Sequence, residues 1–137
     1  MIRILVADDH SVVREGIKQI LAGLDDMTVE DEAESGQEVL LKMTAKDFDL
    51  VLLDISMPGK SGLEVLEEIK VMKPRVPVLI LSMHPEEQYA VRMLRAGASG
   101  YLTKASAPQE LISAIRKVSR GGKYVTVSLA EKLAFEL

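Results

Sequence analysis

Cysteine and tryptophan are absent from this chain of 137 residues, and all aromatic residues together make up 4% of it. Without cysteine, the chain can form neither a disulfide nor a thiolate metal site. Its uninterrupted apolar runs are far shorter than the roughly 20 residues that span a membrane as a helix. Acidic residues (21) outnumber lysine and arginine (17), and no basic stripe favours nucleic acid. We therefore expect a cytoplasmic protein, without a signal peptide or membrane segment, whose binding site attracts cations.

The segment 50–54 organises the rest of the chain. Four apolar residues lead directly into Asp54, and a Pro58-Gly59 turn follows. A short unalternated apolar run of this kind predicts a strand buried on both faces of a parallel sheet. A carboxylate at the C-terminal end of such a strand lies where open α/β sheets hold their ligands. Taken alone, Asp54 is equally well explained as a turn-forming or capping acid.

Strand-like runs alternate with helical patterns along most of the chain. Strands are expected at 2–7, 28–33, 50–54, 75–81 and 99–103, and the helices between and after them begin near residues 11, 35, 61, 85 and 108. Five successive βα units predict an α/β fold, a doubly wound parallel sheet with helices on both faces. The acids within 28–33 suit an edge strand. Ser11 is expected to cap the first helix, with Val12 on its buried face.

The domain is expected to cover residues 1–121. Gly121 and Gly122 end the last long helical pattern, as glycines commonly do. Residues 122–137 then read as a linker and a short helix capped by Ser128, too small to form a domain of their own.

Polar side chains stand at the C-terminal ends of four of the expected strands. They are Asp8 and Asp9 on the first strand, Asp54 on the third, Ser82 on the fourth and Lys104 on the fifth. Because parallel strands end at one edge of a sheet, these groups meet if the first and third strands are neighbours. Two carboxylates about 5 Å apart repel by roughly 3 kcal/mol at an effective dielectric constant near 20. The site therefore needs a cation or a proton.

Mg²⁺ is the favoured cation, because it takes few carboxylates and completes its shell with water and phosphate oxygens. Carboxylates accept phosphoryl groups, and a metal with the Lys104 ammonium would neutralise charge on the phosphoryl oxygens. The Ser82 hydroxyl could donate to one of these oxygens. Each residue also has an ordinary explanation: Asp8, Asp9 and Ser82 could cap helices, and Lys104 could be a solvated strand end. Their joint occurrence at corresponding strand ends favours the phosphoryl site.

Two motifs resemble a known family. DISMPG at 54–59 and AGASGYLTK at 96–104, with the strand-end residues, resemble the receiver domain of bacterial two-component response regulators over roughly residues 1–120. The resemblance implies a flavodoxin-like sheet with strand order 2-1-3-4-5. It implies these roles: Asp54 as phosphoacceptor, Lys104 as catalytic lysine, Ser82 as hydroxyl switch, Tyr101 as aromatic switch, and Asp8, Asp9, Asp54 and the backbone carbonyl of Ser56 as ligands of Mg²⁺.

The resemblance also implies partners. A histidine kinase would transfer its phosphoryl group to Asp54, and phosphorylation could lead to a homodimer. DDHSVVREG at 8–16 looks like the NarL/FixJ-type subfamily, whose output is a helix-turn-helix DNA-binding domain that regulates transcription. No basic recognition helix is found within 122–137. DNA is therefore expected to bind only through an output domain absent from this chain.

Two alternative functions remain open at this point. A Mg²⁺-dependent aspartyl-phosphate hydrolase of the haloacid dehalogenase type also combines a nucleophilic aspartate with serine or threonine and lysine. Its nucleophile normally ends the first strand in a D-x-D pattern, whereas Asp8 and Asp9 are adjacent here. A receiver that binds protein without being phosphorylated is the other alternative. We expect a signalling module that assists its own phosphotransfer and dephosphorylation, not a turnover enzyme.

Three finer expectations concern conformation. Activation is expected to act through the fourth helix, fifth strand and fifth helix, with Ser82 turning toward the phosphoryl group and Tyr101 moving inward. Many receivers have proline after the lysine, but Ala105 follows Lys104 here. We nevertheless expect a cis peptide bond between them, which would aim the ammonium at Asp54. His10 is expected to be a loop residue and His84 at most a residue at the rim of the crevice.

Overall fold

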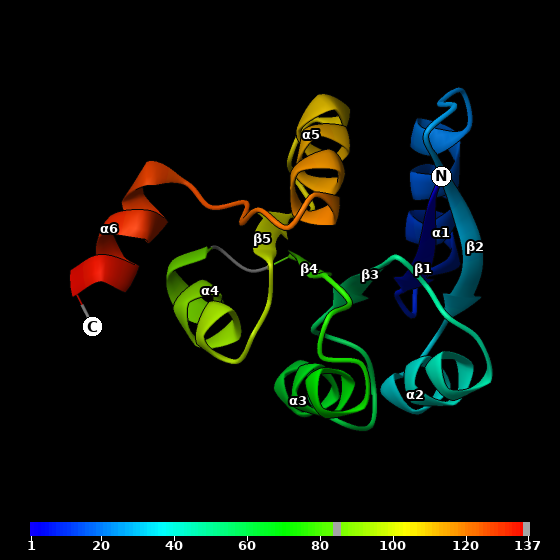
Figure 1. The fold of residues 1–137 in the computed structure, drawn as a ribbon, viewed down its shortest axis with the longest axis horizontal. Helices are drawn as coiled ribbons and strands as arrows, with labels where there is room; N and C mark the ends of the chain where they lie inside the picture. The colour runs from blue at the N-terminus through cyan, green and yellow to red at the C-terminus, as the bar shows by residue number, and fades with distance from the viewer. Residues whose placement is uncertain (84–85, 136–137) are drawn as a thin grey trace.

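A parallel five-stranded sheet forms the centre of the molecule (Figure 1). The computed structural model describes residues 1–83 and 86–135. The strands are β1 (Ile2–Ala7), β2 (Met27–Ala33), β3 (Leu50–Asp54), β4 (Val78–Ser82) and β5 (Gly100–Thr103). The helices are α1 (Ser11–Leu21), α2 (Gly36–Ala45), α3 (Gly62–Met72), α4 (Glu86–Arg95), α5 (Pro108–Ser119) and α6 (Val127–Phe135). The strand order, β2-β1-β3-β4-β5, confirms the predicted doubly wound topology.

The two faces of the sheet carry separate hydrophobic clusters. β3 is buried at all five positions, as its apolar sequence predicted. Leu53 and Ile80 join the cluster that includes residues of α2, α3, α4 and α6. Leu52 and Leu79 join the other cluster, beneath α1 and α5. In Figure 1, α5 lies on one side of the sheet and α2 and α3 lie on the other.

β2 is an edge strand, as its charge suggested. Its register with β1 shifts between Ile4 and Leu5, whose partners are Val29 and Asp31, so Glu30 is an extra residue in β2. A bulge and charged side chains both discourage a second chain from pairing with an exposed strand edge. This edge is thereby protected against such pairing.

Two of the predicted features of the first helix are wrong. α1 begins at Ser11, so the cap position belongs to His10, whose side chain makes no capping bond. Val12 is 82% exposed. The exposure of Val12 follows from the orientation of the helix, which presents Arg14, Ile17 and Leu21 to the protein and turns Val12 away from that face. By contrast, Ser35 and Ser61 cap α2 and α3 by accepting bonds from Glu38 and Glu64.

The last helix begins one residue before the predicted cap. Thr126, not Ser128, takes the cap position, because its hydroxyl accepts a bond from the N–H of Leu129. Leu129 is buried in the same cluster as α2, α3 and α4. α6 packs against α4, at the β5 end of the sheet. Pro85, predicted to open the fourth helix, and His84 lie outside the described residues. Among the described helices, none is both long and apolar enough to cross a membrane.

Candidate functional site

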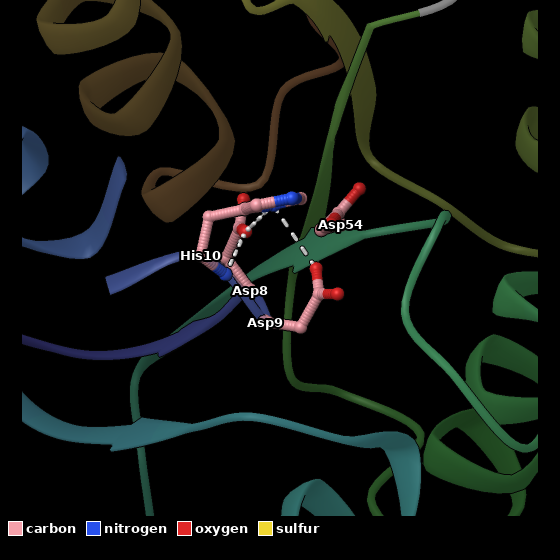
Figure 2. A group of neighbouring side chains, drawn as sticks. All are labelled: Asp8, Asp9, His10 and Asp54. Atoms are coloured by element: carbon pink, nitrogen blue, oxygen red, sulfur yellow. Dashed lines mark hydrogen bonds and ion pairs between the residues drawn. The ribbon is translucent and has the colours of Figure 1, made fainter. Parts of the chain in front are cut away.

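The predicted site residues meet at one edge of the sheet, with one exception. Asp8 follows the last residue of β1, Asp54 and Ser82 end β3 and β4, and Lys104 follows β5. Asp8, Asp9, His10 and Asp54 each present a ligand atom within 4.8 Å of the others (Figure 2). The exception is Tyr101, which is 3% exposed and belongs to the core cluster beside α4 and α6.

Lys104 holds the two buried carboxylates together. Its Nζ lies 2.7 Å from Oδ2 of Asp8 and 3.5 Å from Oδ2 of Asp54. The Lys104 backbone N–H donates to the carbonyl of Ser82 at 2.7 Å, which fixes the end of β5 against the end of β4. One ammonium facing two carboxylates leaves net negative charge, so the site as a whole attracts a further cation.

The buried carboxylates also retain binding capacity. Asp8 and Asp54 are each 1% exposed. Their Oδ2 atoms accept no directed hydrogen bond, although both lie within ion-pair distance of Lys104. Buried polar oxygens without hydrogen-bond partners are uncommon in folded proteins and call for a partner. Three carboxylates, two with such an oxygen, suit a hard divalent cation that prefers oxygen ligands. The residues present therefore fit Mg²⁺.

Asp54 is placed where its charged form is disfavoured. Burial raises the pKa of the Asp54 carboxyl above its ordinary value, and the neighbouring Asp8 carboxylate adds to the increase. The Ser56 N–H, which donates to Oδ1 at 3.0 Å, and the Lys104 ammonium lower this pKa but do not cancel the effect of burial. A cation or an electrophilic group at Asp54 would relieve this unfavourable charge.

His10 contacts the acidic pair, Asp8 and Asp9. The sequence analysis expected only a loop residue at this position and did not predict these contacts. Its Nδ1 lies 3.0 Å from Oδ1 of Asp8 and 3.1 Å from Oδ1 of Asp9 (Figure 2). Its backbone N–H also donates to Oδ1 of Asp8 at 2.8 Å. The signal in the sequence was adjacency, because His10 directly follows the two acids and directly precedes the first residue of α1.

Arg14 is a second residue that sequence reasoning missed. Its guanidinium donates to the carbonyl of Asp8 at 2.6 Å, to Glu32 at 3.0 Å and to Glu34 at 3.2 Å. Arg14 thus ties the end of β1, where the acidic pair begins, to the end of β2. Helical spacing could have indicated that Arg14 faces inward, since position 14 lies on the same face of α1 as Ile17 and Leu21.

The predicted cis bond after Lys104 is wrong. No cis peptide bond occurs among the described residues, and the ammonium nevertheless reaches both Asp8 and Asp54. A cis bond before alanine would cost about 3–4 kcal/mol. The four-carbon stem of lysine is long and flexible enough to reach the carboxylates from a trans backbone. The strain that a cis bond would introduce is unnecessary.

Sequence comparison identifies the family. The sequence model of the response regulator receiver domain matches residues 4–116. The chain is 41% identical over 136 residues to the response regulator GacA of Pseudomonas protegens, covering 99% of this chain and 64% of that protein. It is 40% identical to the response regulator UvrY of Escherichia coli O6:H1, covering 98% of this chain and 62% of that protein. The chain thus spans less than two thirds of the length of these relatives.

Solved structures give the same result. A two-component response regulator of the LuxR family from Aurantimonas sp. SI85-9A1 matches with a TM-score of 0.89 at 32% identity, over 99% of this chain and 97% of that one. The isolated receiver domain of RcsB from Salmonella enterica serovar Typhimurium, with the phosphomimetic BeF₃⁻, matches with a TM-score of 0.86 at 25% identity, over 95% and 96%. These matches do not favour the haloacid dehalogenase alternative. The chain belongs to the response regulator receiver family of two-component signal transduction.

Proposed function

We propose that Asp54 accepts a phosphoryl group from the phosphohistidine of a histidine kinase, with Mg²⁺ bound by Asp8, Asp9, Asp54 and the backbone carbonyl of Ser56. The observation that carries this proposal is the setting of Asp54. Its carboxylate is buried, its pKa is raised, and an ammonium and two further carboxylates surround it. An aspartate kept only as a cap would need neither the ammonium nor the buried acid beside it.

In the proposed reaction an oxygen of Asp54 attacks the phosphorus atom. A P–O bond forms, the P–N bond to the kinase histidine breaks, and the leaving imidazole takes a proton from water. Lys104 lies close enough to pair with a phosphoryl oxygen, since its Nζ is 3.5 Å from Asp54 Oδ2. The Ser82 hydroxyl would donate to another oxygen. Bound Mg²⁺ supplies positive charge that offsets the carboxylates and the phosphoryl oxygens.

The proposed role is that of a switch in the cytoplasm, not of a turnover enzyme. Phosphorylation would shift the protein between two packings through α4, β5 and α5, and only by the differential affinity of the phosphoryl group for them. Tyr101, expected to move inward on activation, is already buried in this structure. Residues 1–121 would form the receiver and 122–137 the connection to an output domain.

The proposed output is transcription regulation through a DNA-binding domain outside this chain, with a homodimer formed on phosphorylation. A solved structure of two RcsB dimers bound to two parallel DNAs, 25% identical over 97% of this chain and 65% of that chain, supports this proposal. Sedimentation with and without BeF₃⁻ and Mg²⁺ tests the dimer. Identical sedimentation over a range of protein concentrations would contradict it.

The proposal is tested by phosphorylation of the chain with a small acyl-phosphate donor. We expect the wild type to take up one phosphoryl group in the presence of Mg²⁺. Asp54→Asn should take up none, because an amide oxygen is a poor nucleophile. Asp49→Asn, a change at an exposed aspartate just before β3, is the matched control and should be labelled like the wild type. Normal labelling of Asp54→Asn would place the acceptor elsewhere.

A further inference from the structure

His10 places a nitrogen ligand beside the acidic pair. Its Nδ1 lies 3.0 Å from Oδ1 of Asp8 and 3.1 Å from Oδ1 of Asp9, so one ring nitrogen faces one oxygen of each acid (Figure 2). The ring does not cap α1, because it makes no capping bond there. The His10 side chain is 62% exposed and that of Asp8 is 2% exposed, so the ring approaches the acids from the solvent side.

The spacing of these atoms suits one small ion. Ligand atoms about 2.0–2.1 Å from a tetrahedral Zn²⁺ lie roughly 3.3 Å from one another. The distances from His10 Nδ1 to the two acidic oxygens, 3.0 and 3.1 Å, are close to that value. Asp54 supplies a fourth ligand atom, within 4.8 Å of one from each of the other three residues. A small inward movement would complete a tetrahedral set of four protein ligands.

Buried oxygens point to a bound ion independently of the spacing. Oδ2 of Asp54, on a carboxylate that is 1% exposed, accepts no hydrogen bond. Asp8 turns its two oxygens to different partners, since Oδ2 is 2.7 Å from Lys104 Nζ and Oδ1 faces His10. An ion between His10 and Oδ1 would therefore leave the ammonium in place. Three carboxylates and one ammonium leave two uncompensated negative charges, which a divalent ion neutralises.

The imidazole distinguishes transition-metal ions from Mg²⁺. Mg²⁺ takes oxygen ligands in an octahedron and keeps several waters, so it gains nothing from His10. Imidazole suits Zn²⁺, Cu²⁺ and Ni²⁺. Four protein ligands close the shell of a tetrahedral Zn²⁺, as in structural zinc sites, whereas catalytic zinc keeps one position open. An ion closed in this way has no position for a phosphoryl oxygen.

We propose a transition-metal site, for an ion such as Zn²⁺, formed by Asp8, Asp9, His10 and Asp54. This ion competes with Mg²⁺ and blocks phosphorylation of Asp54. Binding of the ion depends only on the four side chains, whereas the block rests on the proposed function of Asp54. In the ion-bound form His10 Nδ1 is a ligand and the neutral ring carries its proton on Nε2.

The first measurement is calorimetric titration of the metal-free chain with Zn²⁺ and, separately, with Mg²⁺. We expect His10→Ala to lower the ratio of Zn²⁺ affinity to Mg²⁺ affinity by at least about tenfold, a loss that even outer-shell groups reach. The ratio is the readout because the lost contact with the acids affects both ions, whereas the lost nitrogen ligand affects Zn²⁺. His84→Ala, at the other histidine of the chain, should keep the wild-type ratio. An unchanged ratio in His10→Ala would overturn the site.

His10→Cys separates a metal ligand from a structural contact. Its Sγ reaches nearly as far as Nδ1 and binds Zn²⁺ at about 2.3 Å, whereas Mg²⁺ prefers oxygen. We expect His10→Cys, kept reduced, to restore most of the affinity ratio that His10→Ala loses. A ratio as low as that of His10→Ala would overturn the role of His10 as a ligand. Both variants should fold, because the ring is largely exposed and makes no capping bond.

The block is tested by labelling the chain with an acyl-phosphate donor at a fixed Mg²⁺ concentration while Zn²⁺ is added. We expect Zn²⁺ to stop labelling of the wild type, further Mg²⁺ to restore it, and His10→Ala to need about tenfold more Zn²⁺. Full labelling of the Zn²⁺-saturated wild type would overturn the block. Absence of labelling with Mg²⁺ alone would instead overturn the proposed function and the block with it, and the affinity ratio would still decide the metal site.

Discussion

At the scale of single residues, the carboxyl group of Asp54 determines a pH dependence. Burial, and then the Asp8 carboxylate, raise its pKa in the folded protein above its ordinary value. The folded state therefore binds this proton more strongly than the unfolded state does. The contribution of this proton to the free energy of unfolding is complete below the ordinary pKa of aspartate. It is lost as pH rises through the raised pKa of Asp54 in the folded protein.

Asp54→Asn should consequently stabilise the metal-free protein at neutral pH and have a smaller effect in acid. Urea unfolding of the wild type and the variant, in the presence of a chelator and over a series of pH values, measures the difference in free energy of unfolding. The difference should grow with pH and shrink when Mg²⁺ is added, because a cation offsets the buried charge. A difference independent of pH would contradict the assignment of a raised pKa to Asp54.

Asp9 gives a separate residue-scale prediction. Its side chain is 30% exposed, unlike the buried side chain of Asp8, so it can be changed without disturbing the core. Asp9→Ala should lower Mg²⁺ affinity by at least about tenfold, an effect that even outer-shell partners of metal sites reach. The free energy of unfolding of metal-free Asp9→Ala should equal or exceed that of the wild type, because the variant has less repulsion between carboxylates.

Calorimetric titration with Mg²⁺ makes this measurement. Asp25→Ala removes the same charge from an exposed turn before β2 and serves as the control. An affinity of Asp9→Ala equal to that of the control would mean that Asp9 is not a ligand.

At the scale of elements, Arg14 links α1 to the ends of β1 and β2. Arg14→Ala should lower the free energy of unfolding by about 2 kcal/mol, because it leaves the Asp8 carbonyl without its donor and removes one of the two cations paired with the partly buried Glu32. Arg3→Ala, which breaks an ion pair with Asp49 whose side chains are 43% and 44% exposed, should cost less than about 1 kcal/mol. Denaturant unfolding compares the two variants. Equal losses would show that the Arg14 network contributes no more than a surface pair.

Element ends were harder to predict than element types. The helix starts near residues 35 and 61 were expected from the sequence, and the structure shows Ser35 and Ser61 as the caps there. The predicted caps at Ser11 and Ser128 were wrong, because His10 takes the cap position of α1 and Thr126 takes that of α6. The prediction that Val12 lies on the buried face of α1 was also wrong. A charged residue, Arg14, occupies the inward face there, and hydrophobicity alone assigns that face to valine.

At the scale of the whole molecule, the alternating strands and helices were sufficient to predict the parallel sheet and the edge that carries Asp8, Asp54 and Lys104, but that these residues meet there depended also on the strand order. Strand order was not available from periodicity and came from the family resemblance. The trans bond after Lys104 and the contacts of His10 depend on side-chain reach, which spacing in a sequence does not give. The docking of α6 depends on long-range packing of Leu129, and the sequence pattern around this residue predicts only a short helix.

The central claim is that Asp54 carries the phosphoryl group. The most direct measurement is to phosphorylate the intact chain with an acyl-phosphate donor and Mg²⁺, trap the product by borohydride reduction, and locate the modified residue by peptide mass spectrometry. We expect a single modified position, at Asp54, and none when Mg²⁺ is removed by a chelator. Modification at Asp8, Asp9 or any other residue with Asp54 unmodified would contradict the account.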